Sequence, residues 1–138
     1  IPKGPERLDM LKKIVAVTFL TMLPVGAFAD VAGDAEAGEK VFRKCKACHD
    51  VGAEAKNKVG PVLNGIVGRA VGAVPDFKYS SVLSDMGASG KIWTPEELTA
   101  FLEKPRDYAK GTKMSFAGLR KEDDRVNIIA YLATLEEG

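Results

Sequence analysis

Cysteine and histidine are scarce in this chain, whose 138 residues include two cysteines and one histidine. A structural zinc site uses about four Cys or His ligands, so three such side chains are too few to build one. The two cysteines are separated by only two residues, a spacing across which a structural disulfide is geometrically awkward. The cysteines and the histidine are therefore available for another kind of chemistry.

The chain also lacks a strong excess of charge, because its formal net charge is +1. Since no glycine-rich phosphate-binding loop is present either, binding to nucleic acid is not expected. No βαβ pattern surrounds the cysteines, which weakens the alternative of a thioredoxin-like dithiol oxidoreductase without removing it. No internal repeat or low-complexity tract is present, and the length fits one domain at most.

Both cysteines and the histidine belong to one motif, Lys44-Cys45-Lys46-Ala47-Cys48-His49. The spacing Cys-x-x-Cys-His is the one that attaches a c-type haem covalently. In a helical turn, Cys45 and Cys48 lie on one side, from which both sulfurs can reach the vinyl groups of a single porphyrin. His49 then lies beneath the iron, where a ring nitrogen can be an axial ligand. The motif predicts one haem c bound through Cys45 and Cys48.

A basic pair near the start of the chain, Lys12 and Lys13, precedes an apolar run over residues 14–29. The run ends in Ala27-Phe28-Ala29, the small-residue pattern that signal peptidase cleaves. A retained membrane anchor is the alternative, although the run is shorter than the roughly 20 residues that span a bilayer. Export to the periplasm also suits the thiols, because disulfides and thioethers form outside the reducing cytosol. We predict an upstream extension (1–9), a secretory signal (10–29) and a mature domain (30–138).

Helix start and stop signals mark two segments of the predicted mature domain. Asp34 is a plausible N-cap for a helix that leads into the cysteine motif. Thr94 followed by Pro95 predicts a second helix, since threonine caps the first turn and proline fits its first position. That helix should run to about Lys104 and stop before Pro105.

A third main helix is predicted over residues 122–135, where apolar side chains recur at helical spacing. Gly38 weakens the first helix, so we infer that it allows close contact with this last helix. A short helix is expected over residues 80–85, ended by Gly87 and Gly90, and the remaining Gly- and Pro-rich sequence should be loop. The prediction is an all-α domain with about three main helices plus short helices and loops.

A domain this small, with about half of its residues in loops, has difficulty burying enough apolar surface alone. A haem at its centre would complete the core. We therefore expect the chain without haem to be largely unfolded.

The second axial ligand of the iron is expected to be a methionine. Of four methionines, Met10 and Met22 fall in the predicted signal. Met86 lies at a polar helix end, whereas Met114 lies in a loop with the sequence Gly-Thr-Lys-Met-Ser-Phe. A thioether ligand must be held on a loop of fixed shape over the iron, so we favour Met114.

Several further segments agree with a known family. In chain order they are Gly33-Asp34, Gly38, Phe42, Cys45–His49, Gly60-Pro61, Gly68-Arg69, Phe77-Lys78-Tyr79-Ser80, Trp93, Tyr108, Gly111-Thr112-Lys113-Met114 and Ala130-Tyr131-Leu132. With these segments the chain resembles class I cytochrome c, the group of mitochondrial cytochrome c and bacterial cytochrome c2, over nearly all of residues 33–135. Its short ligand loop is similar to that of the compact forms or of an isocytochrome c2. The resemblance implies a cytochrome c fold wrapped around one covalently bound haem.

The resemblance also implies roles for residues near the predicted haem. Pro61 would accept a hydrogen bond from His49 through its backbone carbonyl, fixing the imidazole tautomer. Tyr79 and Trp93 would hydrogen-bond a haem propionate, and Arg69 would offset the charge of that propionate.

On the side of the second ligand, the resemblance places Tyr108 near the sulfur of Met114. Thr112 and Phe116 would close the same face. The mitochondrial form carries an asparagine where Leu83 stands here, so the buried water network of that form is not expected in this chain.

Basic residues cluster around both predicted iron ligands. Residues 40–46 contain no acid, and residues 104–121 contain one, Asp107. At the edge of a haem, such clusters would form a docking ring that steers an acidic partner to the place where the electron leaves. The basic residues expected to contact partners are Lys44, Lys46, Lys110 and Lys113.

These features predict a soluble, monomeric electron carrier of the periplasm rather than an enzyme. With His49 and Met114 on the iron, no substrate need bind the metal. By resemblance, a quinol-oxidising cytochrome bc complex would reduce the protein, and a photosynthetic reaction centre or terminal oxidase would oxidise it. The alternative is a haem peroxidase or gas-binding sensor, which needs an open sixth site. It is weakened because the chain has no second histidine to act as a distal acid or base.

Overall fold

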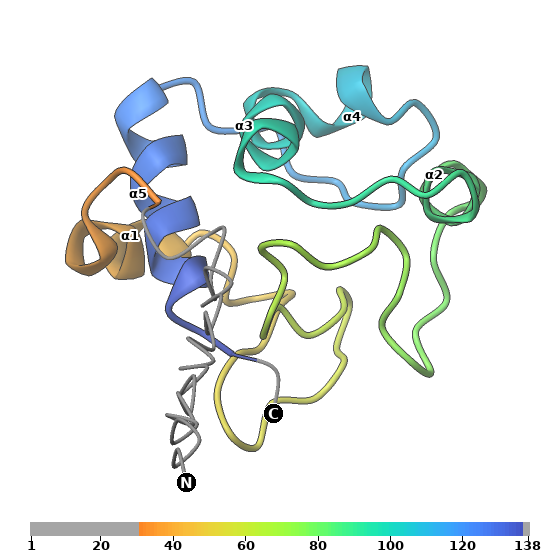
Figure 1. The fold of residues 1–138 in the computed structure, drawn as a ribbon, viewed down its shortest axis with the longest axis horizontal. Helices are drawn as coiled ribbons and strands as arrows, with labels where there is room; N and C mark the ends of the chain where they lie inside the picture. The colour runs from red at the N-terminus through yellow and green to blue at the C-terminus, as the bar shows by residue number, and fades with distance from the viewer. Residues whose placement is uncertain (1–30, 137–138) are drawn as a thin grey trace, which may run out of the picture.

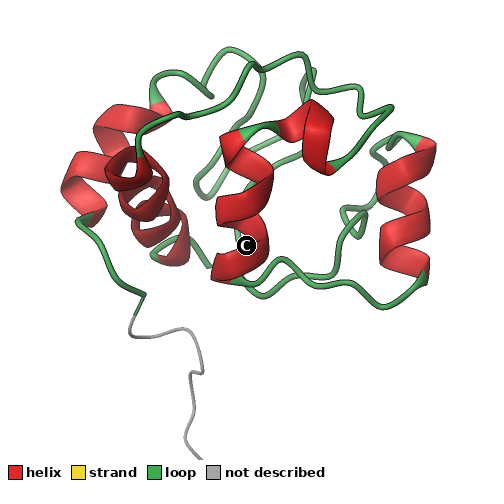
Figure 2. Ribbon diagram, turned by 90° about the horizontal axis from the view of Figure 1, so that it is seen from above, coloured by secondary structure: helices red, strands yellow, loops and turns green. Residues whose placement is uncertain are grey.

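The structure, a computed structural model, describes residues 31–136 (Figure 1). The predicted extension (1–9) and secretory signal (10–29) lie outside the described residues and stay predictions. Residues 31–136 form five helices, α1 (Ala35–Phe42), α2 (Ser81–Ala88), α3 (Pro95–Glu103), α4 (Pro105–Tyr108) and α5 (Glu122–Ala133). These residues form no strand, and one β-bridge joins Ala70 to Ile92. The helices are connected by long loops, as Figure 2 shows, so the prediction of an all-α domain is confirmed.

Two helices begin where their capping residues predicted. The Asp34 carboxylate accepts hydrogen bonds from the backbone N–H groups of Glu36 (2.9 Å) and Ala37 (3.1 Å) at the start of α1. Thr94 accepts one from the N–H of Glu97 (3.2 Å), and α3 begins at the following proline. These side-chain oxygens satisfy N–H groups that have no partner within the helix.

Two helices differ from the prediction. The helix α2 extends to Ala88 because Gly87 lies within it instead of ending it. A Cβ atom on Gly87 would lie 2.0 Å from the carbonyl oxygen of Val71, so glycine here permits close packing. After α3 ends at Glu103, Pro105 begins the four-residue helix α4, which was not predicted. Proline is compatible with the first position of a helix because its missing N–H would have no helical partner there.

The helices α1 and α5 pack closely against each other, as the glycine at position 38 predicted (Figure 1). A Cβ atom on Gly38 would lie 1.9 Å from the carbonyl oxygen of Asn127. One turn later, the rings of Phe42 and Tyr131 lie 5.6 Å apart, centroid to centroid. Because the cysteine motif follows α1 directly, this packing also fixes where that motif begins.

The described residues contain no helix that is both long enough and apolar enough to cross a membrane.

Candidate haem site

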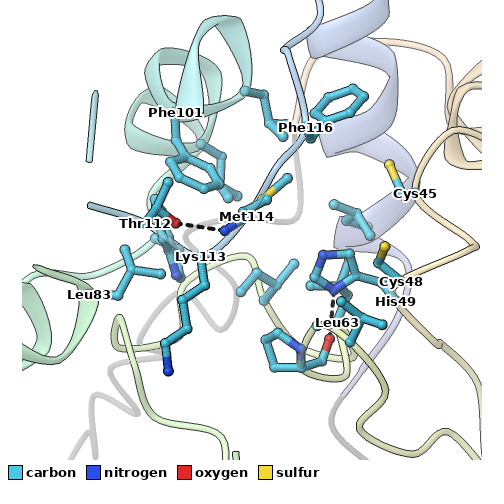
Figure 3. A pocket seen from close by; sticks show the side chains of 18 of the residues that line it. Cys45, Cys48, His49, Leu63, Leu83, Phe101, Thr112, Lys113, Met114 and Phe116 are labelled. Atoms are coloured by element: carbon cyan, nitrogen blue, oxygen red, sulfur yellow. Dashed lines mark hydrogen bonds between the residues drawn. The ribbon is translucent and has the colours of Figure 1, made fainter. Parts of the chain in front are cut away.

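A cavity of about 370 Å³ lies between the helices and the loops (Figure 3). Its volume falls within the roughly 300–1,000 Å³ of typical ligand pockets. Helices α1, α2, α3 and α5 all contribute to its wall. Apolar side chains make up most of its lining, among them Phe42, Leu63, Ile66, Leu83, Trp93, Leu98, Phe101, Leu102, Phe116, Ile128 and Leu132. Most of the buried core residues thus face this space, and the core is built around it.

The cysteine motif forms one side of the cavity. Backbone bonds from Cys45 to the Phe42 carbonyl (2.8 Å) and from Cys48 to the Cys45 carbonyl (3.1 Å) continue helical turns beyond α1. These turns bring Cys45, Cys48 and His49 to the cavity wall together, as the spacing predicted (Figure 3). Both cysteines are half-buried free thiols in this structure.

The surroundings of the Cys45 thiol bear on the alternative of dithiol chemistry. Burial, reinforced by the neighbouring Cys48, raises the pKa of Cys45 to about 11, and the nearby Lys44 only partly offsets this. Redox-active cysteines need a lowered pKa, because the thiolate is the nucleophile. The environment of Cys45 therefore argues against the alternative of a dithiol oxidoreductase.

The imidazole of His49 is held in one orientation. Its Nδ1 lies 2.8 Å from the carbonyl oxygen of Pro61. Since a carbonyl can only accept, Nδ1 carries the proton, and in the neutral ring Nε2 keeps a free lone pair. Burial lowers the pKa of His49, and the positive charges of Lys58 and Arg69 lower it further. The hydrogen bond to Pro61 raises the pKa but does not outweigh these effects. The hydrogen bond expected from the resemblance is present, and the neutral, ligand-competent form of His49 is favoured.

The backbone around Pro61 is fixed by contacts on several sides. The N–H of Gly60 donates to the Cys48 carbonyl (2.8 Å), and a Cβ atom on Gly60 would lie 2.3 Å from Cε1 of His49. The Asn57 side chain accepts from the N–H of Val62 (3.0 Å) and donates to the Pro75 carbonyl (3.1 Å). Glycine at position 60 was a sequence signal, whereas nothing in the sequence pointed to Asn57.

The loop that carries Met114 forms the opposite side of the cavity. Figure 3 shows Met114 with Phe101, Thr112 and Lys113 across from Cys48 and His49. The N–H of Met114 donates to Oγ1 of Thr112 (3.3 Å), and the N–H of Thr112 donates to the Ala109 carbonyl (3.0 Å). These bonds give the loop the defined shape that a thioether ligand needs.

The other methionine of the described residues, Met86, packs against the core from α2. It is outside the cavity lining, whereas Met114 is part of it. The structure therefore favours Met114 over Met86 as the candidate ligand.

Three predicted propionate partners line the cavity together: Arg69, Tyr79 and Trp93. The Tyr79 hydroxyl accepts a hydrogen bond from the N–H of Val74 (3.0 Å), which leaves its own proton available for a further acceptor. The guanidinium of Arg69 donates to the carbonyls of Asn64 and Val62, at 2.9 and 3.2 Å. Their contacts with a propionate stay a prediction.

Tyr108 is outside the cavity lining, and its position near the sulfur of Met114 stays a prediction. Its hydroxyl donates to the carboxylate of Glu97, and its ring packs behind Phe101 at a centroid distance of 5.7 Å. Phe101, and not Tyr108, belongs to the cavity lining. The structure therefore gives no support to Tyr108 as a residue that touches the cofactor, because the hydroxyl has a charged partner on α3.

The comparisons with known proteins agree with this site. Residues 35–136 match the cytochrome c family. The cytochrome c2 of Agrobacterium tumefaciens (strain II Chrys) is 49% identical over 100 residues, which cover 72% of this chain and 90% of that protein. The cytochrome c-550 of Ancylobacter novellus is 52% identical over 97 residues, covering 70% of this chain and 91% of that protein. The solved structure of cytochrome c2 from Rhodospirillum centenum has a TM-score of 0.71 and 41% identity, covering 76% of this chain and all of that one.

A core built around a cavity, with the Cys-x-x-Cys-His motif in its wall, defines a haem protein, and the chain belongs to the class I cytochrome c family. Within this family it is of the cytochrome c2 group, whose members are electron carriers and not enzymes. Family and motif together give its cofactor as one haem c, attached through Cys45 and Cys48.

The residues of the cavity fit this cofactor. Two thiols lie at one side of an apolar space, a neutral imidazole presents a free nitrogen, and polar groups of Arg69 and Tyr79 reach the same space. Within residues 31–136, no three His, Cys, Asp or Glu side chains converge on another possible metal site.

Without haem, the chain is expected to lose most of its helical structure. The variant with both Cys45→Ala and Cys48→Ala cannot form thioether bonds, and an empty cavity of this size leaves the core without its centre. Far-ultraviolet circular dichroism should show a largely unfolded chain with no cooperative thermal transition. The exposed neighbour Ala47 provides the control, since Ala47→Ser should keep both haem and fold. A cysteine-free variant that melts cooperatively would contradict this expectation.

Proposed function

We propose that this cytochrome c2-type protein is a soluble, monomeric carrier of single electrons in the periplasm, with His49 and Met114 as the axial ligands of its haem. The observation that supports this proposal most is that His49 and Met114 line one cavity from opposite sides, each on a backbone held by hydrogen bonds. When bound, the haem supplies an iron that cycles between Fe(III) and Fe(II).

The side chains of the cavity determine how that iron behaves. The thioether of Met114 favours the reduced state, and the bond from His49 to Pro61 orients the imidazole and increases its basicity. Apolar walls such as Phe101 and Leu83 exclude water, which limits solvent reorganisation when the charge changes. With both axial positions filled, the protein needs no substrate site.

For its partners, we propose a quinol-oxidising cytochrome bc complex as the donor and a photosynthetic reaction centre or terminal oxidase as the acceptor. Docking would use Lys44, Lys46, Lys110 and Lys113, all of which are exposed. Lys44 and Lys113 also line the cavity, Lys44 next to the cysteine motif and Lys113 in the loop that carries Met114. Positive charge thus flanks the opening where an electron would leave. Export directed by residues 10–29 would bring the protein to these membrane complexes.

A reduced-minus-oxidised visible spectrum of the exported protein tests the proposed function. We expect the narrow bands of a c-type haem that stays with the chain after acid extraction, together with a methionine-to-iron band near the red edge of the oxidised spectrum. Rapid binding of carbon monoxide to the reduced form would instead favour a peroxidase or gas sensor. Colourless protein would favour a dithiol enzyme.

Reversing the charge of Lys44 or Lys113 to glutamate is expected to slow electron transfer to a membrane partner several-fold at low salt, because electrostatic steering of encounter is lost. The difference should shrink at physiological ionic strength, where charges are screened within about 8 Å. Stopped-flow kinetics at two salt concentrations measure both effects. Lys56→Glu is the control, since Lys56 is exposed but outside the cavity lining. Equal rates for Lys44→Glu, Lys113→Glu and Lys56→Glu would remove the docking role.

A further inference from the structure

The position of the Met114 loop depends on the short helix α4. The loop begins at Ala109, directly after α4, and Ala109 is completely buried. Its N–H donates to the Pro105 carbonyl (2.9 Å), and its carbonyl accepts from Thr112 (3.0 Å), which in turn binds the N–H of Met114. An unbroken series of hydrogen bonds therefore connects α4 to Met114.

Few interactions within α4 itself stabilise this helix. It contains four residues, and its N-cap residue, Lys104, makes no side-chain hydrogen bond to the helix. A helix this short is not stable by itself, because the conformational entropy lost in forming the first turn outweighs the free energy gained from its few hydrogen bonds. Its place must be set by tertiary contacts, and Tyr108 at its end makes several of them.

Tyr108 joins α4 to two other parts of the fold. Its ring lies 5.7 Å from Phe101 and 6.2 Å from Trp93, centroid to centroid, and both of these side chains line the cavity. Its hydroxyl donates to Oε2 of Glu97 on α3. The other oxygen of Glu97 pairs with Lys91 at 3.3 Å, and the Lys91 ammonium lies 5.9 Å from the centre of the Tyr108 ring.

The contact between Glu97 and Tyr108 is a hydrogen bond to a charged group. A hydrogen bond from a hydroxyl to a carboxylate is charge-assisted and about twice as strong as one between neutral groups. It also lowers the pKa of Glu97, which keeps the carboxylate ionised. Because Lys91 holds the opposite oxygen, the carboxylate is fixed toward the Tyr108 hydroxyl.

We propose that Glu97 is a positioning residue for the sixth ligand: through Tyr108 it fixes α4 on α3, and so holds the loop that presents Met114 to the iron. This inference rests on the proposed ligation by Met114. If Met114 ligates the iron, its release would move the loop together with α4, and that movement would break the bond between Tyr108 and Glu97.

Displacement of Met114 by added imidazole tests this proposal. In the oxidised holoprotein, the imidazole concentration that removes half of the methionine-to-iron band measures how firmly the loop is held. Tyr108→Phe keeps the ring and removes the hydrogen bond, so it should lower this concentration about tenfold, the effect of losing a bond to a charged group. Glu97→Gln keeps the side-chain volume and should act in the same direction. The double variant should add little to the larger single effect, because both changes remove one interaction.

Glu96→Gln is the matched control, since Glu96 is the preceding acid of α3 and is exposed. Its imidazole midpoint should stay within twofold of that of the unmodified protein. A merely structural role of Glu97 would lower the denaturant midpoint of unfolding but leave the imidazole midpoint unchanged, which would overturn the proposal. Absence of the methionine band from the unmodified protein would instead overturn ligation by Met114, and this inference with it.

Discussion

Replacing Met114 with alanine is expected to lower the reduction potential by on the order of 0.1 V or more, since axial ligands spread haem potentials over roughly 0.8 V. A thioether stabilises the reduced iron, and alanine offers no donor atom to replace it. The methionine-to-iron band should disappear from the oxidised spectrum, and the reduced protein should bind carbon monoxide. A spectroelectrochemical titration gives the potential and the band in one experiment.

Met86→Ala is the matched control for this substitution. Met86 is also half-buried and packs against the core, but it lies on α2, outside the cavity lining. Its replacement should lower the stability by at most about 2–5 kcal/mol, which is the cost of replacing a buried methionine with alanine. It should not change the reduction potential strongly. If Met86→Ala removed the band and Met114→Ala kept it, the ligand assignment would be wrong.

Local interactions explain why parts of the fold could be predicted from sequence. Asp34 and Thr94 cap helices by binding N–H groups two or three residues away, so the sequence itself contains both partners. The Cys-x-x-Cys-His motif is equally local, because one turn brings Cys45, Cys48 and His49 to the same wall. Gly38 was also informative, since a glycine within a helix indicates that something passes close by.

Tertiary contacts explain the parts that could not be predicted. Gly87 was expected to end α2, but the Val71 carbonyl that approaches it lies sixteen positions earlier, where the sequence pattern contains no sign of it. Tyr108 and Phe101 are both aromatic, but Phe101 lines the cavity whereas the hydroxyl of Tyr108 donates to Glu97 on α3. In both cases, the decisive partner belongs to another element of the fold.

The second large effect is expected at the contact between α1 and α5. Gly38→Ala should destabilise the holoprotein by about 2 kcal/mol or more, because overpacking of a closed interface costs roughly 1–3 kcal/mol and here the obstacle is backbone. The added Cβ atom would lie 1.9 Å from the carbonyl oxygen and 2.6 Å from the carbonyl carbon of Asn127, so the two helices must move apart. A denaturant titration followed by circular dichroism measures the change.

The sign of the Gly38→Ala effect is what makes it informative. Helix propensity alone predicts the opposite result, since alanine stabilises a helix by about 1 kcal/mol relative to glycine. Glu39→Ala, at the next and exposed position of α1, is the control and should change stability by no more than about 0.5 kcal/mol. A stabilised Gly38→Ala variant would show that α1 and α5 do not pack this closely. The cysteine motif would then need another anchor, because α1 ends three residues before Cys45 and positions it through its contact with α5.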